Sequence, residues 1–175
     1  MNPFAVFDLP AVFALPQDEL ERRHLDLAKA VHPDRYAQAL PAERRDAANR
    51  AATVSEAFRI LRDPVKRAEA IFRLAGIGVS ENEVPKASTA FLMDVMEQRE
   101  ALSDARAAKD PAAILQLTKA IEASEGGALE ALASKLAWKE GTPKEDLLPL
   151  LQQLSELRYY RRFLEEAERA LDDCS

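Results

Sequence analysis

Cysteine, glycine and β-branched residues are all scarce in this chain of 175 residues. The single cysteine, Cys174, excludes a disulfide within the chain, and a reducing compartment is therefore expected. Only 5 glycines stand against abundant alanine, leucine, glutamate and arginine, which are strong helix formers. Val, Ile and Thr, the usual residues of strands, are few. This composition predicts an all-α protein.

Long apolar runs and an excess of positive charge are also missing. No stretch approaches the roughly 18 apolar residues of a membrane-spanning helix, and residues 1–10 lack the basic flank and apolar core of a secretory signal. The net charge is −6 and the pI is near 5.1, which argues against nucleic acid as the main partner. We therefore expect a cytoplasmic protein that binds neither nucleic acid nor membrane.

The charge is distributed unevenly along the chain. Residues 1–75 hold 12 basic and 11 acidic residues, whereas residues 76–175 hold 12 basic and 19 acidic residues. A nearly neutral first part and an acidic second part indicate two surfaces with different partners.

Apolar residues at helical spacing predict two long helices in the first part. One runs from about Gln17 to Val31 and is ended by Pro33, because the residue before a proline is pushed out of the helical region. The second starts near Pro41. Asp63 and Pro64 then provide the cap and first residue of a further helix that ends at Gly76. The two long helices predict an antiparallel hairpin.

Glycine, serine, asparagine and proline gather after this hairpin and predict a linker at residues 76–87. Three further helices follow and predict a small bundle. Pro149 lies near the start of the last one, so we expect either a kink or a late start of the regular helix. The predicted division is residues 1–75, linker 76–87 and bundle 88–175.

The tripeptide His32-Pro33-Asp34 lies at the tip of the predicted hairpin. A loop in this position can present side chains to a partner, and proline fixes the backbone so that the aspartate is presented at little entropic cost. The alternative is an ordinary turn, since proline and aspartate are common turn residues. The tripeptide alone does not separate the two.

The helix expected near residues 89–102 has two apolar stripes. Phe91, Val95 and Leu102 form a stripe suited to the bundle core. A second stripe, roughly opposite, consists of Leu92, Met93, Met96, Glu97 and Glu100. Methionines adapt to a partner's shape, so this stripe indicates a binding patch. The periodicity is equally compatible with two stripes that contact two neighbouring parts of the chain. On the last helix, Tyr159 is expected to point outward as an interface anchor.

Two segments resemble a known family. LDLAKAVHPDRY, residues 25–36, is similar to the second helix and loop of a J domain, and AATVSEAFRILRDPVKRAEA, residues 51–70, is similar to its third and fourth helices. A J domain followed by a three-helix bundle, with the FLM sequence at residues 91–93, resembles the HscB family of J-domain co-chaperones.

This resemblance implies two partners and no catalytic residues. The loop would engage the DnaK-class chaperone HscA and stimulate its ATP hydrolysis, with Asp34 as the key anion and with His32 and Pro33 shaping the contact. A basic flank would steer the association; it consists of Arg22, Arg23, Lys29 and Arg35. The bundle would bind the iron–sulfur scaffold IscU through Leu92, Met93, Met96, Glu97, Glu100 and Tyr159.

Other functions receive less support from the sequence. His24 and His32 are eight residues apart and have no cysteine partner, so a metal site is not expected, nor is a cofactor. No nucleophile–base pair stands out, which argues against an enzyme. Two alternatives remain open: a J-domain adaptor that serves a general DnaK-class chaperone with another client, and a helical scaffold with no chaperone role.

Overall fold

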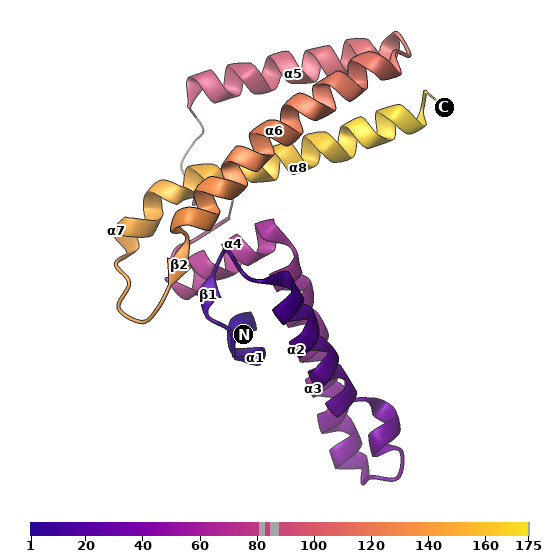
Figure 1. The fold of residues 1–175 in the computed structure, drawn as a ribbon, viewed down its shortest axis with the longest axis vertical. Helices are drawn as coiled ribbons and strands as arrows, with labels where there is room; N and C mark the ends of the chain where they lie inside the picture. The colour runs from indigo at the N-terminus through magenta and orange to yellow at the C-terminus, as the bar shows by residue number, and fades with distance from the viewer. Residues whose placement is uncertain (81–82, 85–87, 175) are drawn as a thin grey trace. The chain divides into compact units, whose positions relative to one another are not determined.

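The computed structural model describes residues 1–80, 83–84 and 88–174, and it confirms the all-α fold (Figure 1). Residues 81–82 and 85–87 of the predicted linker lie outside the described residues. The chain divides into two compact units. The first comprises residues 1–77 and 136–146, and the second comprises the described residues of 78–135 and 147–175.

The first unit is built on a helical hairpin. After the short helix α1 (Pro3–Val6), α2 (Gln17–Ala30) and α3 (Pro41–Arg62) lie side by side, joined at one end by a loop that contains the 3₁₀ turn η1 (Pro33–Tyr36) (Figure 1). Helix α4 (Pro64–Leu74) follows α3 directly. The predicted hairpin is confirmed.

The core of the first unit lies between these helices. Leu20 of α2, Leu61 of α3 and Phe72 of α4 are fully buried. Between α2 and α3 the ring of His24 stacks on Phe58, with the ring centroids 3.9 Å apart. His24 is therefore a packing residue.

Both ends of α4 follow the sequence prediction. The Asp63 carboxylate accepts a hydrogen bond from the Lys66 amide (3.1 Å), and Pro64 is the first helical residue. Gly76 has a φ of +69°, the left-handed conformation that ends many helices and that glycine adopts without steric cost.

A two-stranded sheet in the first unit was not expected. Strand β1 (Ala11–Val12) pairs antiparallel with β2 (Ala137–Trp138), and the Phe13 amide donates to the Leu136 carbonyl (2.8 Å). The Lys144 ammonium donates to the Gly76 carbonyl (3.0 Å). These contacts hold residues 136–146 in the first unit, although the sequence analysis had included them in the bundle. Two-residue strands with partners more than 120 residues away leave no local signal.

The second unit is a bundle of α5 (Thr89–Ala107), α6 (Pro111–Lys135) and α8 (Leu151–Asp172), which lie side by side in Figure 1. Short helices precede α8: α7 (Lys144–Leu147) and the 3₁₀ turn η2 (Leu148–Leu150). Of the two outcomes expected at Pro149, a kink or a late start of the regular helix, the structure has the late start, because α8 begins at Leu151. The buried core includes Leu102 of α5, Ile121 of α6 and Phe163 of α8.

Candidate protein-binding surfaces

The His-Pro-Asp loop places Asp34 in solvent on a short, well-bonded turn. Pro33 starts η1, and the Nδ1 atom of His32 accepts a hydrogen bond from the Asp34 amide (3.3 Å). The Arg35 amide donates to the His32 carbonyl (3.0 Å), and the Tyr36 hydroxyl donates to the Ala30 carbonyl (3.5 Å). The Asp34 side chain is 89% exposed. Its carboxylate lies 3.5 Å from the Nδ1 atom of His32 and is otherwise open to a cation from a partner.

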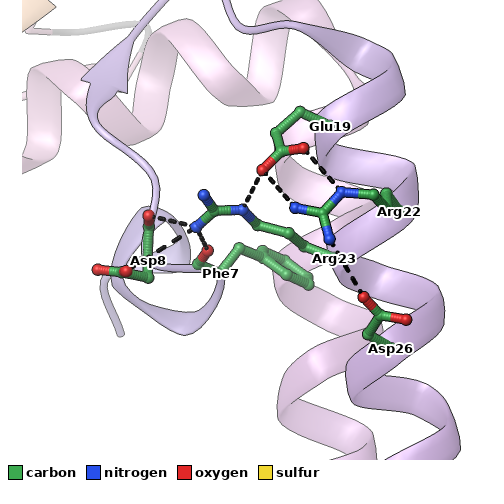
Figure 2. Close-up of polar contacts among 6 residues, drawn as sticks. All are labelled: Phe7, Asp8, Glu19, Arg22, Arg23 and Asp26. Atoms are coloured by element: carbon green, nitrogen blue, oxygen red, sulfur yellow. Dashed lines mark hydrogen bonds and ion pairs between the residues drawn. The ribbon is translucent and has the colours of Figure 1, made fainter.

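The predicted basic flank divides into two pairs. Figure 2 shows Arg22 and Arg23 converging on Glu19: both oxygens of Glu19 accept from Arg22 (2.8 and 2.9 Å), and one also accepts from Arg23 Nε (2.6 Å). Arg22 also reaches Asp26, at 3.4 Å. These hydrogen bonds, first from Arg22 and then from Arg23, lower the pKa of Glu19 to about 2. The charge of Arg22 is therefore largely neutralised within α2.

Arg23 links α2 to the segment that follows α1. Its Nη1 atom donates to the carbonyl oxygens of Phe7 and Asp8, both at 2.6 Å (Figure 2). Hydrogen bonds from a charged donor are among the stronger ones in proteins. Arg23 thus holds the N-terminal turn against α2, whereas the exposed Lys29 and Arg35 have no ion pair among the described residues. The second pair is the free part of the flank.

Helix α5 exposes an apolar patch, which we call the α5 patch: Leu92, Met93 and Met96. Their exposed fractions are 50%, 57% and 71%. The Ser88 hydroxyl caps the helix by accepting from the Phe91 amide (3.2 Å), and Glu97 and Glu100 lie exposed beside the patch. The first stripe behaves differently: Phe91 and Val95 pack against the bundle core and Leu102 is buried in it. The side chains of the second stripe are thus exposed, whereas those of the first stripe belong to the bundle core.

The outward orientation expected for Tyr159 is wrong. Tyr159 is only 8% exposed, and its ring packs edge-on to Phe91 and tilted to Phe163, at 5.6 and 6.1 Å. Its hydroxyl lies 3.4 Å from the Val95 carbonyl and 3.2 Å from the Gln98 side-chain oxygen. Burial raises the pKa of this hydroxyl to about 12. Tyr159 lies on the side of α8 that α5 covers, a contact that periodicity along α8 alone does not reveal.

Metal-binding groups and membrane-spanning helices are both absent from the described residues. No group of three His, Cys, Asp or Glu side chains there is placed to hold a metal ion. No helix in the same residues has the length and apolar character to span a bilayer.

Known proteins resemble the chain over nearly its whole length. A co-chaperone protein HscB homolog of Mannheimia succiniciproducens is 34% identical over 173 residues, which cover 98% of this chain and 96% of that protein. This chain belongs to the HscB family of co-chaperones. The family model described as the HSCB C-terminal oligomerisation domain matches residues 87–168. An HscB homolog of Bordetella parapertussis is 46% identical over 119 residues, 68% of this chain and 69% of that one.

Solved HscB structures share the fold. The chaperone HscB from Vibrio cholerae superposes with a TM-score of 0.83 at 31% identity, covering 100% of both chains. The human co-chaperone protein HscB gives a TM-score of 0.84 at 22% identity, covering 97% of this chain and 81% of that one, and this match shows the fold alone. The HscB chain described here is accordingly a co-chaperone and not itself an enzyme.

Proposed function

We propose that this HscB chain binds the scaffold IscU through α5, delivers it to the DnaK-class chaperone HscA, and stimulates ATP hydrolysis by HscA through the His-Pro-Asp loop. The observation that carries the proposal is the pairing of two exposed surfaces of different chemistry: an acidic tip on one unit and an apolar patch on the other. Such surfaces suit an adaptor with two partners.

The tip supports the chaperone half of the proposal. Asp34 is the exposed anion, and the hydrogen bonds of His32 and Tyr36 fix the turn that presents it. A prefixed turn loses little conformational entropy on binding. The loop acts on the chaperone by binding its hydrolysis-competent arrangement more tightly than the other, which shifts the population toward it. Lys29 and Arg35 steer the encounter.

The α5 patch supports the scaffold half. Leu92, Met93 and Met96 are half or more exposed, and full burial of a side chain of this size contributes about 1.5–3 kcal/mol. Methionine side chains follow an irregular partner surface. The acidic neighbours Glu97 and Glu100 favour a partner with a basic rim.

The decisive experiment is single-turnover ATP hydrolysis by HscA, with and without this protein and with and without IscU. We expect each to raise the rate and the two together to raise it more than the product of their separate effects. Asp34→Asn removes the stimulation and keeps IscU binding. Asp18→Asn, at the far end of α2 from the loop, is its matched control.

The scaffold half has its own variant. Leu92→Ala with Met96→Ala should weaken IscU binding at least tenfold, since it removes apolar area from the centre of the patch. Leu115→Ala with Leu148→Ala, 48% and 45% exposed elsewhere in the bundle, should leave it unchanged. Equal binding by both double variants would contradict an α5 site.

Stimulation of a general DnaK-class chaperone in place of HscA, without IscU binding, would favour an adaptor with a different client.

A further inference from the structure

A hollow beside the His-Pro-Asp loop is lined by residues of the loop and also by residues of α3. It has a volume of about 580 Å³ and lies between η1 and the first turns of α3. Its apolar lining is formed by Pro33, Tyr36, Ala37, Pro41, Ala47 and Ala48. Asp34 lines the hollow as an anion, and Arg44 and Arg45 line it as cations. We call it the loop–α3 hollow.

Arg44 and Arg45 are available to a partner. Both are exposed, and neither forms an ion pair among the described residues. The nearby Glu43 is engaged, because its carboxylate accepts a hydrogen bond from the Leu40 amide (3.0 Å). In the sequence the two arginines lie in a mixed run of charges, Glu43 to Asp46, which is typical of a solvated helix face and does not by itself indicate a binding site.

The position of the two arginines does not serve the stability of α3. The helix begins at Pro41, so both lie within its first two turns. The N-terminus of a helix carries partial positive charge, which favours acidic residues there and disfavours basic ones. Arg44 and Arg45 add to this positive potential. The resulting field beside the apolar lining favours a carboxylate from outside the chain.

We infer that the loop–α3 hollow receives an acidic, partly apolar segment of the same chaperone that binds Asp34. This inference rests on the proposed function, and it enlarges the chaperone site from the loop onto α3. The segment that fits has a cation for Asp34, an apolar side chain for the alanine and proline lining, and a carboxylate for the two arginines. Complementary charge of both signs fixes the register of the segment as well as its affinity.

The test compares two charge-reversal variants of equal net charge. Arg44→Glu with Arg45→Glu alters the hollow. Arg50→Glu with Arg62→Glu alters two exposed arginines of α3 that do not line it. The readout is the concentration of each variant that half-maximally stimulates ATP hydrolysis by HscA, measured at low and high salt. Thermal unfolding checks both variants, and Arg44→Ala with Arg45→Ala serves as a milder second variant.

We expect the hollow variant to raise the half-maximal concentration about tenfold at low salt and less at high salt. The control should change it less than about twofold. Similar effects of the two variants would overturn the inference while leaving the proposed function intact, provided Asp34→Asn still abolishes stimulation. Stimulation by Asp34→Asn equal to that of the unaltered protein would contradict the proposed function instead. Loss of self-association in the hollow variant, with stimulation unchanged, would assign the hollow to a second copy of this chain and overturn the inference.

Discussion

Tyr159 provides the sharpest test of the bundle, because the sequence predicts an interface anchor at this position and the structure buries it. Tyr159→Ala removes a ring that is only 8% exposed and contacts Phe91 and Phe163. Truncation of a buried aromatic side chain to alanine lowers the free energy of unfolding by about 3–5 kcal/mol. Tyr159→Phe removes only the hydroxyl, and its contacts with Val95 and Gln98 are long, so we expect a loss of about 0.5–1.5 kcal/mol.

Urea unfolding followed by far-UV circular dichroism measures both changes. With an m-value of about 2 kcal/mol per molar urea, the midpoint should fall by about 1.5–2.5 M for Tyr159→Ala and by less than about 1 M for Tyr159→Phe. Titration of IscU into the same variants then separates stability from binding. Tyr159→Phe should bind as the unaltered protein does, since its ring still supports the α5 patch from beneath.

The opposite pattern would refute this account of Tyr159. If Tyr159→Ala unfolded at an unchanged urea concentration but no longer bound IscU, the ring would be a surface anchor and the packing of α5 on α8 would be wrong. The fully buried Phe163, on the same helix, is the matched control. Phe163→Ala should lose a similar free energy of unfolding.

Three further predictions concern the first unit. Arg23→Ala should lower the free energy of unfolding by about 1.5–3 kcal/mol, because two backbone carbonyls lose a charged donor. Arg22→Ala should have a smaller effect, because its ion pair with Glu19 is exposed to solvent. Equal melting temperatures of the two variants would contradict this. Glu19 has a lowered pKa in the folded protein, so the stability linked to its ionisation is fully present above its unfolded pKa of about 4.3 and is lost as the pH falls through about 2. The difference in melting temperature between the unaltered protein and Glu19→Gln should therefore shrink as the pH is lowered over that range. A constant difference would argue against the ion pairs of Glu19. Replacement of residues 137–145 by a glycine–serine linker of equal length should accelerate hydrogen exchange at the Phe13 amide. An unchanged exchange rate would show that the β1–β2 pairing does not protect this amide.

The helices of this protein follow from local sequence. Apolar spacing predicts α2 and α3, Pro33 ends the first of them, and Asp63 with Pro64 starts α4, as the structure confirms. The sequence also predicts that Leu92, Met93 and Met96 form a second apolar stripe, in addition to the one apolar face that a bundle helix needs. Each of these features depends on residues within a few turns of one another.

The features that were missed depend on contacts between distant segments. From the sequence, Arg23 is predicted to be a surface cation, whereas in the structure it donates hydrogen bonds to the carbonyls of Phe7 and Asp8. From the sequence, residues 136–146 are predicted to belong to the bundle, whereas the pairing of β2 with β1 places them in the first unit. Short pairings of this kind carry no periodic signal, because each strand has only two residues.

Composition, helical periodicity and the proline positions were thus enough to establish an all-α chain, its hairpin and the residues at its tip, because backbone sterics and local hydrophobic patterns act within a single element. Whether Tyr159 faces solvent or core, and whether Arg44 and Arg45 border a hollow, depended on which other element covers or flanks them. That information arises only when the helices pack, since the burial of a side chain is a property of its neighbours in space.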